Sequence, residues 1–281
     1  MTATVASEGP LPLARRVADR FVSLHGLRFA VVTGSVARGL ADGSSDLDVY
    51  LYWDDLDVDA LRDTARLDGV TSSRAFAVPT ADGWFEKHVV DGRYVDVESV
   101  PVARLAAAAT AADAGDPWPG LHALAAGLRD AVPLVGADEL GRWQQRLVYG
   151  DRLATAEVGR LVPRLLSPTA LYELTILRGD ALSFQARLSD GLLAAVGLLA
   201  AANRRFVPVT EPKWLRWHVA RLDVQPERFW ERVDEGLLRP SSAAMAELDA
   251  LLDEVLDIVD VSVPSPATAR GRFALALRPN P

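Results

Sequence analysis

Two aspartates separated by one residue, Asp46 and Asp48, stand at the head of the segment DLDVYLYW, whose β-branched and aromatic residues are typical of a strand. Side chains alternate along a strand, so both carboxylates point to the same face and lie close together. Two such negative charges repel each other unless a cation lies between them, and a hard divalent ion prefers oxygen ligands. The pair therefore predicts a Mg²⁺ site.

A second acidic strand can complete this site. Residues 93–100, RYVDVESV, place Asp96 and Glu98 on one strand face. We expect Asp96, at the centre of the strand, to be the third ligand, with Glu98 in reserve. Glu86, on the preceding strand, is a further candidate for the same cleft. Three carboxylates are suited to two metal ions, which lie about 3.5–4 Å apart in such centres.

A glycine-serine step precedes the aspartate pair. The strand predicted over residues 28–33 ends at Gly34 and Ser35, and a loop with a further glycine at Gly39 follows. Backbone N–H groups and a hydroxyl at such a step can face an anion, and the missing Cβ of Gly34 lets a phosphate come near the backbone. Together with the metals, this predicts binding of a nucleoside triphosphate and transfer of its nucleoside monophosphate group, with pyrophosphate leaving in line.

These features occur in a fixed order: Gly34-Ser35, Gly39, Asp46-x-Asp48 and the later strand carboxylate Asp96. The set resembles the signature of the DNA polymerase beta-like nucleotidyltransferase superfamily, in the small-molecule branch that includes the kanamycin and lincosamide nucleotidyltransferases. The resemblance covers about residues 28–100. It implies a mixed sheet flanked by helices, catalysis that depends on two Mg²⁺ ions, an NTP co-substrate, with ATP as the expected donor, and a second, helical domain that closes the cleft.

The resemblance also suggests site residues in the helical half. In the kanamycin enzyme, a glutamate early in the helical domain is the general base for the acceptor hydroxyl, and a lysine there contacts the triphosphate. By order and surroundings, Glu173 and Lys213 match these two residues, although Glu173 fits a solvated helix surface and Lys213 fits a lysine that extends over an aromatic face. Arg178 and Asn203 are comparable candidates for phosphate or base contacts, with helix capping as the alternative for Asn203.

The pattern along the chain predicts an α+β protein. We expect a nucleotidyltransferase domain over residues 1–135, a helical domain over 136–262 that closes on substrate and nucleotide, and an extended tail over 263–281. In the first domain, strands are predicted at 28–33, 46–53, 74–78, 84–90 and 93–100, with helices at 11–24 and 57–67. The last two strands are joined by Asp91-Gly92, a strong hairpin signal.

Composition excludes several classes of site. The chain of 281 residues has no cysteine and four scattered histidines, so disulfides, thiolate-bound metals and thiol nucleophiles are excluded. A net charge of −8 argues against a long basic track for DNA. The N-terminus lacks the pattern of a signal peptide, and the longest apolar run, 192–202, is short for a bilayer span. We expect a cytoplasmic protein that does not enter a membrane.

Three functions are compatible with this reading. The first is nucleotidyl transfer to a hydroxyl of a small molecule, such as an aminoglycoside-like or other natural product, since an acidic surface suits a cationic acceptor. The second is a toxin-like nucleotidyltransferase that acts on tRNA or on a protein. The third is a nucleotide-binding module without catalysis. The identity of the NTP and of the acceptor stays open, as does the choice between a monomer and a homodimer.

Overall fold

The computed structural model describes residues 9–59, 61, 73–80, 83–90, 92–118, 120–210 and 212–276. Their helices and strands are α1 (Pro10–Asp19), β1 (Leu27–Val32), α2 (Gly34–Ala37), β2 (Leu47–Trp53), β3 (Ser73–Thr80), β4 (Gly83–Val90), β5 (Arg93–Pro101), α4 (Val102–Ala114), α5 (Leu121–Asp130), β6 (Val132–Val135), α6 (Ala137–Arg146), α7 (Asp151–Leu161), α8 (Pro168–Thr175), α9 (Ala181–Ala202), α10 (Leu215–Val219), α11 (Phe229–Leu238), α12 (Ser242–Ser262) and α13 (Pro266–Ala276). Short 3-10 helices, η1 (Val162–Arg164) and η2 (Ile176–Arg178), precede α8 and α9.

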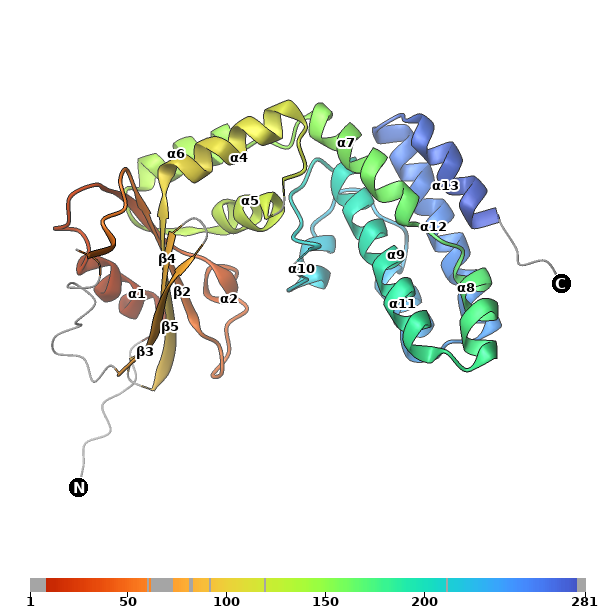
Figure 1. Ribbon diagram of the computed structural model, residues 1–281, viewed down its shortest axis with the longest axis horizontal. Helices are drawn as coiled ribbons and strands as arrows, with labels where there is room; N and C mark the ends of the chain where they lie inside the picture. Colours follow the sequence, from red (N-terminus) through yellow and green to blue (C-terminus); the bar gives the residue numbers. More distant parts are fainter. Residues whose placement is uncertain are drawn as a thin grey trace, which may run out of the picture. The chain divides into compact units, whose positions relative to one another are not determined.

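The described strands form one six-stranded sheet in the order β3-β4-β5-β2-β1-β6 (Figure 1). β2 and β5 run parallel, and the other neighbouring strands are antiparallel. Helices flank this mixed sheet, and a helical region follows it, so the predicted α+β fold class is confirmed. The parallel register sets Asp48 directly opposite Asp96.

The two faces of the sheet differ in chemistry. One face packs against α1, as Figure 1 shows, through a buried apolar cluster that includes Leu13 and Val17 of the helix and Val49 and Val97 of the strands. Because side chains alternate along each strand, the residues between these core positions point to the opposite face. Asp48 and Asp96 therefore share the face that is turned away from α1.

The predicted strands are confirmed, and two other elements differ from expectation. The first helix ends at Asp19, and turns continue to Gly26, where the prediction ran to residue 24. β6 (Val132–Val135) was not among the predicted strands. Most of the predicted helix 57–67 lies outside the described residues.

The extended tail predicted from residue 263 is wrong over most of its described part. α13 spans Pro266–Ala276, and Ala267, Gly271 and Leu275 are buried in it. The prolines suggested an extended chain, but Pro266 occupies the first position of the helix, where proline costs no hydrogen bond.

The chain divides into two compact units. The first contains Met1–Thr110 and Leu124–Val148, and the second contains Ala111–Ala123 and Tyr149–Pro281. The division thus differs from the single boundary expected after residue 135. α6 belongs to the sheet unit, in which Glu139 accepts a hydrogen bond from Arg28 of β1 at 3.2 Å. Residues 111–123 belong to the helical unit, in which His122 contacts Glu157 at 3.1 Å.

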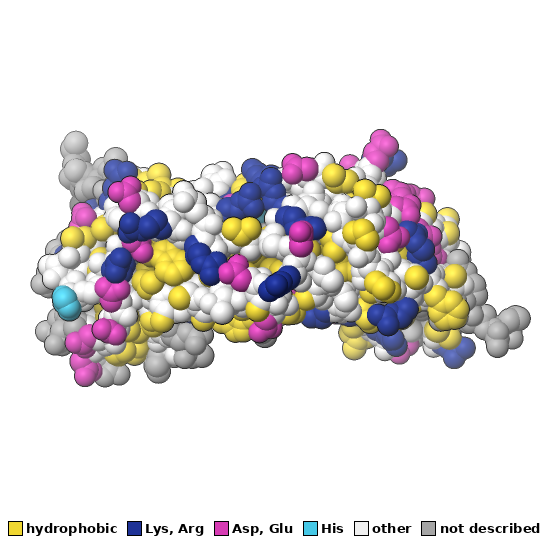
Figure 2. Space-filling view, turned by 90° about the horizontal axis from the view of Figure 1, so that it is seen from above, with side chains coloured by type: hydrophobic (Ala, Val, Ile, Leu, Met, Phe, Trp, Pro, Cys, Tyr) yellow, Lys and Arg dark blue, Asp and Glu magenta, His cyan; other side chains and the backbone are white. Residues whose placement is uncertain are grey.

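The helical unit is built around α9 and α12. α9 is long and apolar enough to cross a membrane, but 67% of its most apolar window is buried among the other helices, as expected of the core helix of a soluble protein. Ion pairs stabilise the surface of the unit, for example between Arg232 and Glu254 at 2.8 Å. Figure 2 shows a face of the protein on which Lys and Arg side chains are scattered among Asp and Glu side chains.

Candidate metal centre

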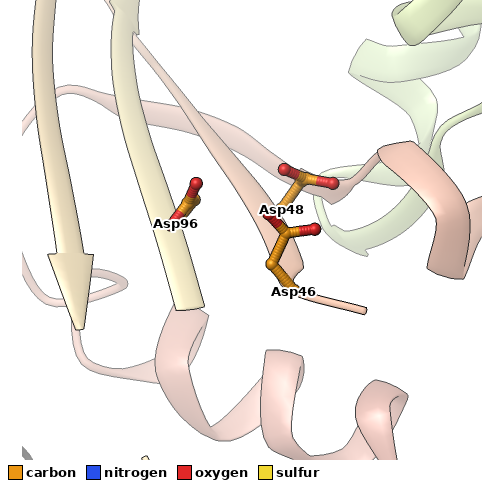
Figure 3. Close-up of side chains that lie close together, drawn as sticks. All are labelled: Asp46, Asp48 and Asp96. Carbon is orange, nitrogen blue, oxygen red and sulfur yellow. The ribbon is translucent and has the colours of Figure 1, made fainter. Parts of the chain in front are cut away.

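Three carboxylates converge on the sheet face that is turned away from α1. One oxygen from each of Asp46, Asp48 and Asp96 lies within 4.8 Å of the others (Figure 3). Asp48 comes from β2, Asp96 from β5, and Asp46 from the chain just before β2 begins. All three are half-buried. The structure thus brings together the three residues that the sequence indicated as metal ligands, and within the described part of the chain no other group of this kind occurs.

Gly34 is fitted closely against this centre. Its φ is +64°, and a Cβ atom built on it would lie 1.8 Å from Asp48 Oδ2 and 2.9 Å from Asp48 Cγ. The preceding residue, Thr33, donates its N–H to the backbone carbonyl of Asp48 at 3.0 Å. The four-residue helix α2 begins at Gly34, and the Ser35 side chain next to it is buried. Only glycine therefore permits the present position of the Asp48 carboxylate.

The loop that leads to Asp46 is held by its own side chains. Asp42 accepts hydrogen bonds from the Ser44 hydroxyl at 2.8 Å and from the Ser44 backbone N–H at 2.9 Å. These bonds lower the pKa of Asp42, with a further contribution from the Ser45 hydroxyl. Arg93, at the start of β5, donates to the Ser45 carbonyl at 3.2 Å. Asp46 is thereby connected to a structured turn.

A second contact fixes the end of α2. The Arg38 guanidinium donates to Asp130, at the end of α5, at 2.8 Å, and only 9% of the Arg38 side chain is exposed. This ion pair ties the glycine-serine step to the rest of the sheet unit. It could not be predicted from the sequence, because 92 residues separate its partners.

Glu98, the reserve ligand, lies outside the carboxylate group. Burial, followed by the negative charge of Glu98, raises the pKa of Tyr50, which is hydrogen-bonded to that carboxylate. The Arg104 guanidinium lies 3.8 Å from Glu98 Oε1. Two residues after Tyr50 on β2, Tyr52 stacks on Phe29 of β1, with ring centroids 4.3 Å apart. Glu98 is therefore engaged by its neighbours within the face.

Glu86, the further candidate for the cleft, faces the other side of the sheet and does not join the carboxylates. Its side chain is 2% exposed and lies on the same sheet face as the core residue Val97. It accepts a hydrogen bond from Trp84 Nε1 at 2.8 Å, and its other oxygen lies 2.9 Å from His88 Nε2. In the register of β4 and β5, Glu86 is opposite the core residue Val97. It is Lys87, one residue later, that is opposite Asp96.

Lys87 is a charged neighbour of the centre that the sequence reading missed. Its Nζ lies 2.5 Å from Asp96 Oδ1, which is close enough for an ion pair. The ammonium group thus occupies part of the Asp96 carboxylate, which has about four lone-pair sites in all. The signal was present in the sequence: the two-residue Asp91-Gly92 turn sets the hairpin register, with Val90 opposite Arg93 and hence Lys87 opposite Asp96.

The four other candidate residues belong to the helical unit. Glu173 on α8 and Arg178 at the end of η2 are exposed, and Lys213 is exposed in the turn before α10. Asn203 ends α9, and its amide group donates to the carbonyls of Leu199 and Val224 and accepts from the Val224 N–H, each at 2.8 Å. These bonds give Asn203 a capping role. The role of Glu173 as general base and the nucleotide contacts of Lys213, Arg178 and Asn203 stay predictions.

No protein-family model matches the sequence, and no curated protein matches it significantly. Among solved structures, a nucleotidyltransferase-like protein from Exiguobacterium sibiricum 255-15 is 11% identical, with a TM-score of 0.42 over 90% of this chain and 78% of that chain. An aminoglycoside 6-adenyltransferase from Bacillus subtilis is 10% identical, with a TM-score of 0.34 over 95% of this chain and 97% of that chain. Both TM-scores lie below 0.5.

Proposed function

We propose that the protein is a Mg²⁺-dependent nucleotidyltransferase, which moves a nucleoside monophosphate group from an NTP, with ATP as the expected donor, to a hydroxyl of a small molecule. The observation that carries this proposal is the convergence of Asp46, Asp48 and Asp96 beside Gly34. A metal centre next to a glycine, whose backbone is not covered by a side chain, would suit a phosphate ester, because phosphate oxygens bind both divalent ions and backbone N–H groups.

The donor set fits Mg²⁺. All three ligands are carboxylates, and their oxygens are close enough to surround hard cations that prefer oxygen. A carboxylate has about four lone-pair sites, so Asp96, whose Oδ1 contacts Lys87 at 2.5 Å, can still bind a cation. When bound there, Mg²⁺ would supply charge neutralisation at the α-phosphate and the leaving pyrophosphate, and would acidify the acceptor hydroxyl.

The chain itself would contribute position and orientation. Gly34 keeps the space beside Asp48 free of a side chain, so the backbone of the glycine-serine step can come near a phosphate. The Thr33 N–H holds the backbone of Asp48, and the turn organised by Asp42 holds Asp46. The ligands are thus oriented before the substrate arrives, which reduces the cost of assembling the reacting geometry.

In this proposal the helical unit supplies the remaining groups. Glu173 would accept the proton of the acceptor hydroxyl, while Lys213 and Arg178 would bind phosphate oxygens through charge-assisted hydrogen bonds. All three side chains are exposed and hence accessible to a substrate. Asn203 would act mainly by holding the end of α9.

The proposed acceptor is a cationic small molecule of the aminoglycoside type. The net charge of −8 favours the approach of an amine-bearing acceptor over that of a polyanion such as tRNA. A transfer to tRNA or to a protein would instead leave the label on a macromolecule, and a binding module would leave all acceptors unchanged. A single assay can separate these outcomes.

The test is a mass-spectrometric screen. The protein, Mg²⁺ and each common NTP are incubated with pooled aminoglycosides, lincosamides and nucleosides, and separately with bulk tRNA and with the protein alone. We expect a small molecule to gain the mass of one nucleoside monophosphate as pyrophosphate is released. A label on tRNA or on protein would replace the small-molecule acceptor, and the absence of transfer in every pool would contradict the proposed activity.

A further inference from the structure

Lys87 stands directly beside the proposed metal centre. It is opposite Asp96 in the antiparallel register of β4 and β5, and its Nζ lies 2.5 Å from Asp96 Oδ1. The side chains are 25% and 17% exposed, so water screens this ion pair only in part. The Nζ atom also lies 5.3 Å from the centre of the Tyr94 ring, which is two residues before Asp96. Asp96 and the Tyr94 ring together hold the ammonium group at the edge of the centre.

Side chains alternate between the two faces of the sheet along β4, so Lys87 points to the face opposite to that of Glu86 and His88. Glu86 and His88, on either side of it, are buried and contact each other. Lys87 alone of these three shares the face of the carboxylates. A lysine at this point reduces the negative charge of a centre made of three carboxylates.

We propose that Lys87 is a positioning residue of the metal centre, which holds Asp96 by an ion pair and weakens the binding of a divalent ion at Asp96 until the nucleotide is bound. This inference rests on the proposed function, because it assumes that Asp96 is a metal ligand. The negative charges of the triphosphate would then offset the ammonium charge, so the full set of metal ions would assemble only with the substrate.

The size of the effect follows from Coulomb's law. An ion bound to Oδ1 of Asp96, which lies 2.5 Å from Nζ, would be within about 4.6 Å of the ammonium group, and an ion bound to Oδ2 within about 7 Å, given metal–oxygen distances of about 2.1 Å. Even with the dielectric constant of water, repulsion between single and double positive charges at ~6 Å changes affinity by about tenfold. Removal of the Lys87 charge should therefore tighten divalent-ion binding by about this factor or more when no nucleotide is present.

The experiment is a Mn²⁺ titration followed by electron paramagnetic resonance, with and without an ATP analogue whose α,β-bridging oxygen is replaced by a methylene group. Wild type is compared with Lys87→Met, Lys87→Arg and the control Arg28→Met. Arg28 pairs with Asp54, six residues beyond Asp48 and hence about 20 Å along β2, so its loss changes the net charge equally but at a distance. Thermal unfolding of each variant establishes that it is folded.

We expect Lys87→Met to bind Mn²⁺ about tenfold more tightly than wild type without nucleotide, and the difference to shrink when the analogue is present. Lys87→Arg and Arg28→Met should behave like wild type. If Lys87→Met binds Mn²⁺ no more tightly than wild type, while Asp48→Asn abolishes binding, the role of Lys87 is overturned and the metal centre stands. If wild type binds no more Mn²⁺ than Asp48→Asn, the metal centre and this inference are both overturned.

Discussion

Replacement of Gly34 by alanine tests the geometry of the centre most sharply, because the added atom meets a ligand directly. The new Cβ would lie 1.8 Å from Asp48 Oδ2, and real Cβ atoms essentially never come within 3.0 Å of another atom. The carboxylate must therefore shift by about 1.2 Å or more. A misplacement of about 1 Å at a reacting centre can cost roughly 10²-fold in rate.

The variant also carries a backbone cost that has to be separated from this effect. At φ +64° an alanine is strained by about 1–2 kcal/mol relative to glycine. Gly39, in the same loop, is the matched control, because its φ is +70° and a Cβ there would have no atom within 4 Å. Gly39→Ala should thus lose a similar amount of stability without displacing a carboxylate.

The assays are nucleotidyl transfer, measured as pyrophosphate release with an acceptor from the screen, together with Mn²⁺ binding and urea denaturation of both variants. We expect Gly34→Ala to lose about 10²-fold or more in transfer rate and to bind Mn²⁺ weakly, while Gly39→Ala keeps both properties within a few fold. Equal effects of the two substitutions on Mn²⁺ binding would refute the reasoning, since strain alone would then explain the loss.

Two further predictions concern the helical unit. Glu173→Gln should lower the transfer rate by about 10²–10⁴-fold without changing the urea midpoint, because the side chain is exposed, and an unchanged rate would remove Glu173 from the mechanism. For the buried Glu157, burial alone would raise the pKa, but hydrogen bonds with His122 and Arg160 outweigh it and lower the pKa below 4.5. Its stabilising contribution is therefore complete above about pH 4.5 and is lost as the pH falls through the folded pKa. Urea denaturation should show Glu157→Gln about 1–3 kcal/mol less stable at pH 7, with a difference that shrinks as the pH falls through the folded pKa of Glu157. A difference independent of pH would contradict this role of the Glu157 carboxylate.

The strands that carry the centre could be predicted because their signals are local. The β-branched and aromatic run from Leu47 and the Asp91-Gly92 turn need no knowledge of distant contacts. The expected trio of Asp46, Asp48 and Asp96 is brought together in the structure. The parallel pairing of β2 with β5, which sets Asp48 opposite Asp96, joins segments 48 residues apart. Local patterns alone do not determine such a pairing.

The errors have equally specific causes. β6 has only four residues and contains Pro133, and a proline normally argues against a strand. The strand lies at the edge of the sheet, where a proline is tolerated, so its sequence indicates a strand only weakly. Residues 266–276 were predicted to belong to an extended tail because the segment contains prolines and its apolar residues do not form a clear helical stripe. Glu86 was a candidate for the cleft although the hairpin register assigns that face to Lys87. In this last case the information was in the sequence, since a two-residue turn fixes every pair in the hairpin.

The central claim is that the three carboxylates hold the metal ions for nucleotidyl transfer, and its most direct test compares wild type with Asp48→Asn. Both proteins are incubated with Mg²⁺, the NTP and the acceptor found in the screen, and mass spectrometry follows the acceptor and the released phosphate species. We predict that wild type adds one nucleoside monophosphate per pyrophosphate released, and that Asp48→Asn, folded with an unchanged thermal midpoint, does neither. Transfer by Asp48→Asn at the wild-type rate, or release of orthophosphate in place of pyrophosphate by wild type, would contradict the account.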